Sequence, residues 1–393
     1  MQHPILVLNA GSSSLKFSIY EKRAHHTLAA GAHGEAERLD TAQPHLTVRG
    51  PQGQPLADRA IAGSGHHGAI EAIHAWFAAH VGNERGFAAV GHRVVHGGQR
   101  FVAPVRIDAD VLVAIAALTP LAPLHQPHHV EAIRAVSAVA PDVVQVACFD
   151  TAFHRTIPMI EREFALPRAL TAQGIVRYGF HGLSYEYIST VLAALDARWQ
   201  ERRTVIAHLG NGASLCALAG GQSVATTMGL SAVDGLMMGT RSGALDPGAL
   251  LYLLRQGGYS PDTAEHLLYN ESGLLGVSGI SSDMRTLEQS ADPQAAHAID
   301  LFTYRAAREL AALAGVLGGL DTLVFTAGIG ENAPSVRAQI CRRAAWLGIA
   351  LDETANAANA AIVSSQPSAV TVRVIPTDEN LMIARHTLSL LEN

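Results

Sequence analysis

Three glycine-containing segments follow apolar runs and have the composition of phosphate-binding loops. They are "NAGSSSLK" (9–16), "HLGNGAS" (208–214) and "TAGIGEN" (326–332). Glycine lets backbone N–H groups approach an anion closely. None of the three has the G-x-x-x-x-G-K-[ST] spacing of a P-loop. The first segment alone is explained equally well as a turn, but three such loops in one chain favour a nucleotide.

Two arginines lie in unusual surroundings. Arg93 is part of an otherwise apolar strand in "GHRVVHGG" (91–98), and Arg241 lies in the glycine-rich loop "LMMGTRSGALDPG" (236–248). A planar guanidinium is well matched to carboxylate or phosphate. A strand arginine often points only to solvent, and that alternative stays open for Arg93. Arg241 follows Met237 and Met238, which do not indicate a solvated surface, so it is the stronger candidate.

Three more polar residues stand at element ends. Asp150 ends an apolar run in "CFDTAFH" (148–154), His181 precedes a predicted helix in "RYGFHGLSYEY" (177–187), and Glu379 begins one in "IPTDENLMIARHT" (375–387). Each has an ordinary alternative: a turn residue, a core histidine, or an acid favoured by the helix dipole by about 0.3 to 1 kcal/mol. Ligands of open α/β sheets collect where strands end, so these positions also indicate a site.

The chain alternates short β-branched runs with alanine-rich helical patterns, which predicts an α/β fold. Apolar residues recur at helical spacing over 69–81 and 298–320. The polar stretch 33–60 is typical of a hairpin-rich surface excursion. The predicted strands cover residues 5–9, 88–95, 143–149, 204–209, 322–327 and 370–375.

A faint internal repeat predicts two domains built on one plan. "LVLNAGSSSLKFSIY" near the start and "VIAHLGNGASLCAL" from Val205 both read as strand, Gly/Ser-rich loop and second strand. In the second copy Gly220 and Gly221 are placed as a two-residue hairpin turn. Two or three domains also suit a length of 393 residues. We expect the two loops to face each other across a cleft.

Composition excludes several classes of protein. A formal net charge of −6 gives no basic surface for nucleic acid. No segment has the roughly 18 consecutive apolar residues of a membrane helix, and the N-terminus has no signal-peptide pattern. Cys148, Cys216 and Cys341 are too few for a disulfide framework and do not form a C-x-x-C metal motif. We therefore expect a cytoplasmic protein without a membrane or nucleic-acid partner.

Nine segments in this order resemble the acetate kinase family. The resemblance implies the duplicated ribonuclease-H-like, or actin-like ATPase, fold that sugar kinases, heat-shock chaperones and actin share, and it implies a homodimer. It also implies reversible phosphorylation of acetate by ATP to acetyl phosphate and ADP. An N-terminal acyl/phosphate domain would span 1–150, completed by the C-terminal helix 380–393, with a nucleotide-binding domain at 151–379. The segments are "LVLNAGSSSLKF", "GHRVVHGG", "CFDTAFH", "RYGFHG", "HLGNGAS", "GLMMGTRSG", "SSDMRTLE", "FTAGIGEN" and "PTDENLMIAR".

The resemblance also implies roles for individual residues. Arg93 would bind the acyl substrate, Asp150 would be the active-site acid, and His181 and Arg241 would stabilise the transition state. Asn9 and Glu379 would lie at the Mg²⁺ ion, or Mn²⁺ in its place. Since the carboxylate of the acyl substrate is already ionised at pH 7, it needs no strong general base, and Asp150 is better interpreted as an orienting or metal-linked group than as a proton abstractor. The implied ATP-binding residues are Ser12, Ser14, Lys16, His208, Leu209, Gly210, Asn211, Gly212, Asp283, Met284, Arg285, Gly328, Ile329, Gly330, Glu331 and Asn332.

The chain departs from the family pattern where the acyl pocket is expected. Ala232 replaces a family proline that walls this pocket together with Val95, Leu124 and Phe180, and Gln126 replaces the asparagine of a family "HNP". The thinner wall predicts readier use of propionate, although one methylene is worth only about 1 to 3 kcal/mol. Two rivals remain: a propionate or butyrate kinase with acetate as secondary substrate, and a nonenzymatic ATP-driven binder resembling actin or chaperones.

Overall fold

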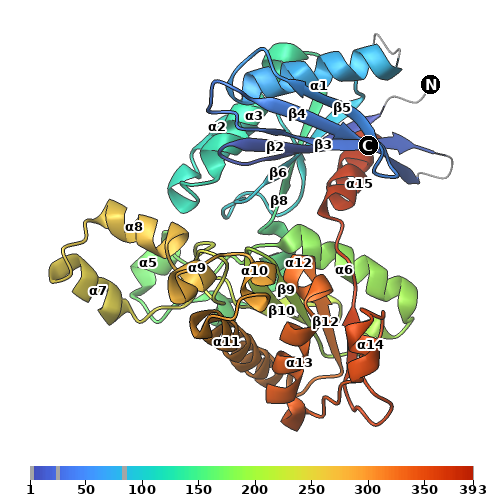
Figure 1. The fold of residues 1–393 in the computed structure, drawn as a ribbon. Helices are drawn as coiled ribbons and strands as arrows, with labels where there is room; N and C mark the ends of the chain where they lie inside the picture. The colour runs from blue at the N-terminus through green and yellow to red at the C-terminus, as the bar shows by residue number, and fades with distance from the viewer. Residues whose placement is uncertain (1–3, 24–26, 82–85, 393) are drawn as a thin grey trace. The chain divides into compact units, whose positions relative to one another are not determined.

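The computed structural model describes residues 4–23, 27–81 and 86–392. The chain forms two compact units: unit 1 comprises Met1–Ala152 with Asp378–Asn393, and unit 2 comprises Phe153–Thr377. Figure 1 labels the elements of each unit. The extreme ends of the chain, residues 1–3 and 393, which the sequence assigns to the N-terminal domain, lie outside the described residues.

Unit 1 is built on an eight-stranded sheet of order β5-β4-β3-β2-β1-β6-β8-β7. β1 pairs antiparallel with β2 and parallel with β6, and β6 pairs parallel with β8. The polar stretch 33–60 forms two antiparallel hairpin connections, β3-β4 and β4-β5, that extend this sheet. The strands are β1 Ile5–Ala10, β2 Ser14–Lys22, β3 Leu28–Glu37, β4 His45–Arg49, β5 Pro55–Ala60, β6 Ala89–Val94, β7 Val105–Arg106 and β8 Val144–Phe149.

Helices cover both faces of the unit 1 sheet. Val90 of β6 packs with residues of α1 (Gly65–Val81) and α3 (Gln126–Val139). The next residue, Gly91, faces α15 (Glu379–Glu392), where a Cβ atom would lie 2.6 Å from Ile383 Cγ2. Because successive strand residues point to opposite faces, α15 covers the face away from α1 and α3. The remaining helices of this part are α2 Ala109–Ala116 and a 3₁₀ turn at Thr119–Leu121.

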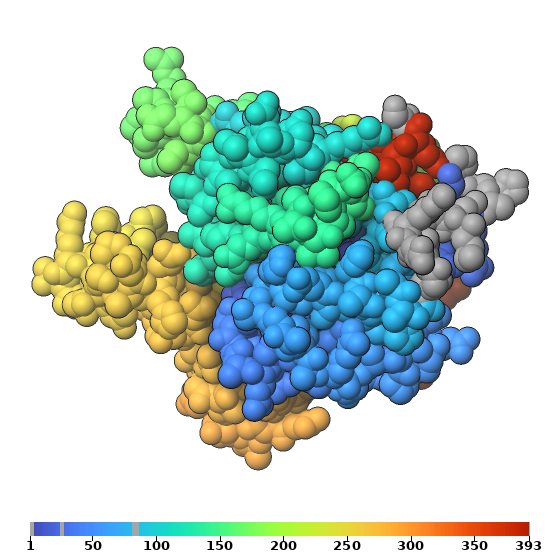
Figure 2. All heavy atoms as spheres, turned by 90° about the horizontal axis from the view of Figure 1, so that it is seen from above, coloured from blue at the N-terminus to red at the C-terminus, as the bar shows by residue number. Residues whose placement is uncertain are grey.

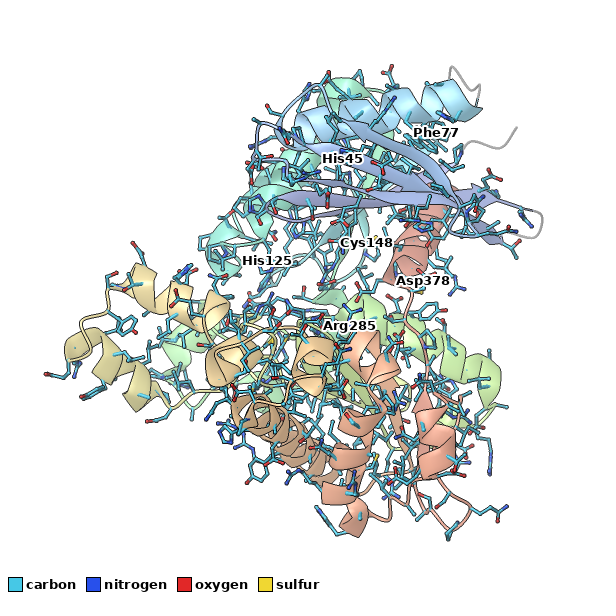
Figure 3. The ribbon with its side chains drawn as sticks, viewed as in Figure 1. His45, Phe77, His125, Cys148, Arg285 and Asp378 are labelled. Carbon is cyan, nitrogen blue, oxygen red and sulfur yellow. The ribbon has the colours of Figure 1, made fainter. Side chains whose placement is uncertain are left out.

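The apolar stripe predicted over 69–81 is the buried face of α1. Ile70, Ile73 and Phe77 are all at least 96% buried against strands β1, β2 and β4 and helix α3. Figure 3 shows Phe77 on the α1 layer of unit 1. Burying each such side chain contributes about 1.5 to 3 kcal/mol to folding.

Unit 2 repeats the plan of unit 1. Its sheet has the order β11-β10-β9-β12-β13, with β9 antiparallel to β10 and parallel to β12. This matches β3-β2-β1-β6-β8 strand for strand and confirms the duplicated fold. Gly220 and Gly221 have φ of 60° and 77°, as a type I′ hairpin turn requires. The strands are β9 Thr204–Leu209, β10 Ala213–Ala219, β11 Gln222–Thr226, β12 Thr322–Thr326 and β13 Thr371–Val374.

Helices complete unit 2, and two of them stand out from it. Figure 2 shows α7 and α8, in yellow, as a projecting lobe. The helices are α4 Met159–Arg162, α5 Arg168–Ala172, α6 Gly182–Leu195, α7 Pro247–Arg255, α8 Pro261–Asn270, α9 Gly273–Ser278, α10 Met284–Glu288, α11 Pro293–Leu317, α12 Ala327–Asn332, α13 Pro334–Arg343 and α14 Glu353–Ala357, with 3₁₀ turns at Ala152–Thr156, Trp199–Glu201 and Ala345–Leu347.

One local prediction was wrong. "TAGIGEN" was expected to be a glycine loop, but it forms the short helix α12 directly after β12. Both ends of this helix find polar partners. The Glu331 carboxylate accepts a hydrogen bond from the Ala327 N–H at 2.8 Å, and the Arg337 guanidinium donates to the carbonyls of Gly330 and Glu331. These side-chain hydrogen bonds offset the low helix propensity of two glycines.

Candidate active site

The polar candidates of unit 1 gather at one edge of its sheet. β1, β6 and β8 are parallel, so their carboxyl ends lie at the same edge. Asn9 is near the end of β1, Arg93 is near the end of β6, and Asp150 follows the last residue of β8. The Cys148 label in Figure 3 marks the neighbouring end of β8. This is the edge at which ligands of open α/β sheets bind.

Arg93 and Asp150 form a bidentate ion pair. The Arg93 Nη2 donates to Asp150 Oδ2 at 2.7 Å, and Nε lies 3.1 Å from both carboxylate oxygens. The Asp150 side chain is 1% exposed and that of Arg93 is 20% exposed. Burial lowers the pKa of Arg93, but the Asp150 and Glu379 carboxylates more than offset it and keep the pKa above its usual value. The guanidinium is therefore a permanent positive charge in a fixed orientation.

The register of the strands settles the orientation of Lys16, which the sequence left open. Lys16 of β2 lies directly opposite Asn9 of β1, so the two side chains are on the same face of the sheet. Arg93 follows in register on β6, and its Nη1 is 3.5 Å from Asn9 Oδ1. Leu15 and Phe17, on either side of Lys16, are buried, whereas Lys16 is exposed. The Lys16 ammonium thus belongs to the same polar face as Asn9 and Arg93.

Oxygen donors on this edge suit a hard divalent cation. Asn9 offers an amide oxygen, Asp150 and Glu379 offer carboxylates, and the Glu379 charge acts on the Arg93 guanidinium. Glu379 is the first residue of α15, and Asp378 before it caps the helix by accepting from the Leu381 N–H at 2.8 Å. Figure 3 labels Asp378 at this helix start. Carboxylate and amide oxygens are the ligands that Mg²⁺ prefers.

The pocket-wall candidates of unit 1 differ in exposure. Val95 is 4% exposed, whereas Leu124 is 40% exposed. Gln126, which departs from the family asparagine, is fully buried at the start of α3. Its Nε2 donates to the carbonyls of His96 and Ile115, both at 3.1 Å. This glutamine amide therefore fastens the start of α3 to the segment after β6.

The histidine candidates of unit 2 stack on each other. The His181 ring lies 4.2 Å from that of His208, centroid to centroid, at an angle of 19°. The Nδ1 of His181 bonds with the Ser214 hydroxyl at 2.8 Å, and the Nδ1 of His208 bonds with the Ser184 hydroxyl at 2.8 Å. His181 has φ of 59°, in the left-handed region, directly before α6. Strain of this kind, about 1 to 3 kcal/mol, collects at functional sites.

His181 and Arg241 meet at the second glycine loop. A Cβ atom on Gly212 would lie 3.1 Å from His181 Nε2 and 3.8 Å from Arg241 Nη1. The Arg241 Nη1 also donates to the Ala232 carbonyl at 3.0 Å, which fixes its guanidinium. The same loop is braced by the Gly239 N–H, which donates to the Asn211 carbonyl at 2.9 Å. An imidazole nitrogen and a guanidinium nitrogen therefore lie beside the same glycine.

A cavity of about 440 Å³ in unit 2 brings together three of the predicted ATP-binding segments. This volume lies within the usual 300 to 1,000 Å³ of ligand pockets. Asp283 caps α10 and pairs with the exposed Arg285 at 3.0 Å, and Figure 3 labels Arg285. Predicted residues that line the cavity are Gly210, Asn211, Asp283, Met284, Arg285, Gly328, Ile329 and Asn332.

Other predicted ATP-binding residues are buried or bonded within their own unit. Leu209 is 0% exposed in β9. Gly330 is buried, and the Glu331 carboxylate accepts from the backbone N–H groups of Ala327 and Thr377. Ser12 and Ser14 belong to unit 1, in and directly after the β1–β2 turn, which closes through a bond from the Gly11 N–H to the Ser14 carbonyl.

The loop that carries Ala232 is held by the side chain of Arg177. The Arg177 Nη1 donates to the carbonyls of Thr226, Thr227 and Met228 and lies 3.7 Å from Asp234 Oδ2. Ala232 itself is half-buried, and Phe180, the other wall candidate of unit 2, is 2% exposed. A single arginine thus holds the peptide that precedes and follows Ala232.

Three positioning residues escaped sequence reasoning. Arg337 is completely buried and fixes α12, a wall of the cavity, through the carbonyls of Gly330 and Glu331. Ser214 joins His181 to the Tyr185 hydroxyl. His154 accompanies Asp150 in "CFDTAFH", and its Nε2 donates to the Phe180 carbonyl at 2.8 Å. Burial lowers the pKa of His154 to about 4, so this imidazole is neutral at pH 7.

The duplicated sheet and the glycine-lined cavity are those of the actin-like ATPase fold class. The profile of the Acetokinase family matches residues 4–385, and this chain belongs to that family. Acetate kinase of Rhodopseudomonas palustris (strain TIE-1) is 50% identical over 100% of this chain and 99% of its own length. Within the described residues, no helix is both long and apolar enough to cross a membrane.

Solved structures agree with this assignment. An acetate kinase from Porphyromonas gingivalis has a TM-score of 0.90 at 36% identity, covering 99% of this chain and 100% of that one. A propionate kinase from Francisella tularensis subsp. tularensis SCHU S4 has a TM-score of 0.92 at 39% identity, with the same coverage. The fold is therefore shared by kinases named for two different acyl substrates.

Proposed function

We propose that this chain transfers the γ-phosphoryl group of ATP to acetate, which yields acetyl phosphate and ADP, and that it also catalyses the reverse reaction. The observation that carries the proposal is the meeting of His181 and Arg241 at Gly212, a loop residue next to two lining residues of the unit 2 cavity. An imidazole and a guanidinium are suited to the charge that develops on a transferring phosphoryl group.

The main barrier is electrostatic, because an anionic nucleophile approaches a polyanion. Two unit charges about 4 Å apart repel by roughly 4 kcal/mol at an effective dielectric constant of 20. Acetate is already ionised at pH 7 and needs no general base. Arg93 would bind the acetate carboxylate, and Arg241 with His181 would bind the γ-phosphoryl oxygens. Asp150, paired at 2.7 Å with Arg93, would orient that guanidinium rather than abstract a proton.

Nucleotide and metal binding complete the proposal. Gly210, Asn211 and the segments 283–285 and 328–332 would bind ATP, and the family resemblance implies that Lys16 binds its phosphates. Asn9 and Glu379 would hold Mg²⁺, which neutralises phosphate charge when bound. The oxygen donors at the sheet edge of unit 1 support this choice of a hard cation. We also propose a cytoplasmic homodimer, which light scattering of the purified chain would test.

The experiment is an ATP-dependent assay in which hydroxylamine traps the acyl phosphate. Acetate, propionate and butyrate are compared by kcat/KM, and ADP is measured in parallel. The proposal expects one acyl phosphate per ADP, with acetate as a good substrate. ADP release without acyl phosphate would instead support a nonenzymatic ATP-driven binder.

One observation favours propionate as a second substrate. Ala232 stands where a proline is expected, and its backbone is fixed by Arg241 and by the Arg177-anchored loop. A missing proline ring leaves room for one methylene, worth about 1 to 3 kcal/mol. Ala232→Pro should therefore lower the propionate-to-acetate ratio of kcat/KM by about tenfold. An unchanged ratio would argue against this wall.

A further inference from the structure

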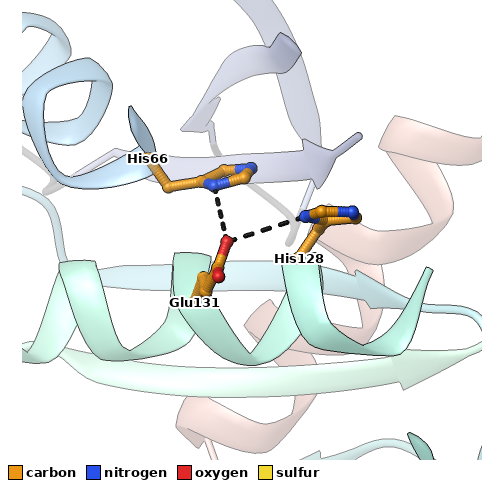
Figure 4. A group of neighbouring side chains, drawn as sticks. All are labelled: His66, His128 and Glu131. Atoms are coloured by element: carbon orange, nitrogen blue, oxygen red, sulfur yellow. Dashed lines mark ion pairs between the residues drawn. The ribbon is translucent and has the colours of Figure 1, made fainter. Parts of the chain in front are cut away.

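A cluster of two histidines and one glutamate lies in unit 1 apart from the residues assigned above. His66 belongs to the first turn of α1, and His128 and Glu131 lie one turn apart on α3. One ligand atom from each residue lies within 4.8 Å of the other two. Figure 4 shows both imidazole rings directed at the same carboxylate. We propose that this cluster is a binding site for a first-row transition metal ion of the zinc class.

The hydrogen bond behind His66 fixes the tautomer that a metal requires. Its Nε2 lies 2.9 Å from the Gly11 carbonyl, and a carbonyl can only accept, so Nε2 carries the hydrogen. In the neutral ring, Nδ1 then presents a lone pair to Glu131 Oε2 at 3.2 Å. Metal-binding histidines commonly donate their other N–H to a backbone carbonyl in this way.

The spacing of the three ligand atoms fits a shared metal ion. His128 Nδ1 is 3.6 Å from Glu131 Oε2, too far for a hydrogen bond, and it is buried without any hydrogen-bond partner. Ligand atoms about 2.0 to 2.1 Å from a tetrahedral Zn²⁺ lie about 3.3 Å from one another. The observed 3.2 and 3.6 Å bracket this spacing. A cation between the three atoms would relieve the juxtaposition of electron-rich groups.

Chemistry and access determine which cation is expected. Two imidazole nitrogens and one carboxylate suit Zn²⁺, Co²⁺ or Ni²⁺, whereas Mg²⁺ prefers oxygen ligands only. The cluster borders a surface pocket that Asp40 and Arg134 also line, and the Glu131 side chain is 57% exposed. Solvent can therefore supply the fourth ligand and a path for the ion. Arg134 is the one cation among these lining residues and would weaken binding, whereas Asp40 would strengthen it.

The site is one hydrogen bond away from the β1–β2 turn. His66 contacts Gly11, and the Gly11 N–H closes the turn onto Ser14 at 2.8 Å. A bound ion would lock the His66 ring, join α1 to α3, and so restrain this turn. The expected consequence is slower amide hydrogen exchange at residues 11–14 when the metal is bound.

The test uses the full chain without a histidine tag, stripped with EDTA and titrated with Zn²⁺ in excess Mg²⁺. The variant Glu131→Gln removes one ligand at an exposed position, and His128→Asn removes another. His67→Asn is the matched control, because His67 lies next to His66 but pairs with Glu71 at 3.3 Å. Co²⁺ absorption reports four-coordinate geometry independently.

The proposal expects one Zn²⁺ equivalent that Mg²⁺ does not displace, with affinity at least about tenfold weaker in Glu131→Gln and His128→Asn. His67→Asn should bind as the wild type does. Zn²⁺ should slow amide hydrogen exchange at residues 11–14 in the wild type but not in Glu131→Gln or His128→Asn. Equal Zn²⁺ affinity in wild type and Glu131→Gln would overturn the proposed site. The cluster would then be held by a proton shared between histidine and glutamate. Loss of the same equivalent in His67→Asn would also overturn it.

Discussion

Adding one methyl group at Gly212 is a sharp probe of the proposed phosphoryl-transfer site. In Gly212→Ala the new Cβ would lie 3.1 Å from His181 Nε2, about 0.3 Å inside the shortest ordinary contact of 3.4 Å. The ring cannot simply retreat, because it stacks on His208 at 4.2 Å and bonds to Ser214. Gly212 is not among the glycines with positive φ, so alanine is compatible with the backbone there.

The expected result is a loss of activity without a loss of folding. Blocking one preorganised donor costs about 2.7 to 4 kcal/mol of transition-state stabilisation, or about 10² to 10³ in kcat. Acetyl phosphate formation is measured by hydroxylamine trapping, and the thermal midpoint is measured alongside. Gly315→Ala is the matched control, since a Cβ there meets nothing within 4 Å. That change should leave kcat unaltered and stabilise α11 by about 0.5 to 1 kcal/mol.

A folded Gly212→Ala variant with kcat within about threefold of wild type would refute the reasoning. It would mean that neither His181 nor Arg241 acts at this loop. A drop in the thermal midpoint with unchanged specific activity would assign Gly212 a packing role only.

Three further predictions follow from other parts of the chain. Lys16→Met should raise the KM for ATP about tenfold with little change in kcat, because Lys16 shares the face of Asn9; an unchanged KM would remove it from the site. Burial lowers the pKa of His154 to about 4, so the unfolded chain binds more protons between pH 6.5 and 4 and stability falls as the pH drops. Between pH 7 and 5, His154→Gln should lose about 2 kcal/mol less unfolding free energy than wild type, measured in urea; equal losses would contradict this. Arg337→Met should cost at least about 3 kcal/mol, seen as a lower thermal midpoint, since it strands the carbonyls of Gly330 and Glu331 in the interior; a smaller cost would show that water replaces the guanidinium.

The sequence predicted the fold because its signals are local. Periodicity identified α1 and the strands that carry Arg93 and His208, and Gly220-Gly221 identified the β10–β11 hairpin. The repeat predicted the shared sheet plan, which the strand orders bear out. The register of the β1–β2 hairpin, which neither composition nor periodicity specifies, places Lys16 opposite Asn9.

The remaining features depend on side-chain hydrogen bonds that neither propensity nor periodicity shows. α12 was missed because its stability comes from Arg337 and Glu331 rather than from the propensities of "AGIGEN". The bracing of His181 by Ser214 was equally invisible, since a lone serine in a strand gives no sequence signal. The His66–Glu131 pair joins two helices whose packing no periodicity specifies.

The central claim is that two arginines stabilise transfer of a phosphoryl group to a carboxylate. Its most direct test is the rate of acetyl phosphate formation from ATP and acetate in wild type, Arg93→Ala and Arg241→Ala, with ADP release measured in the same samples. Wild type should form acetyl phosphate and ADP in equal amounts. Each variant should lose at least about 100-fold in kcat/KM, the order expected for a charge-stabilising group. Undiminished acetate-dependent ATP turnover in both variants would contradict it.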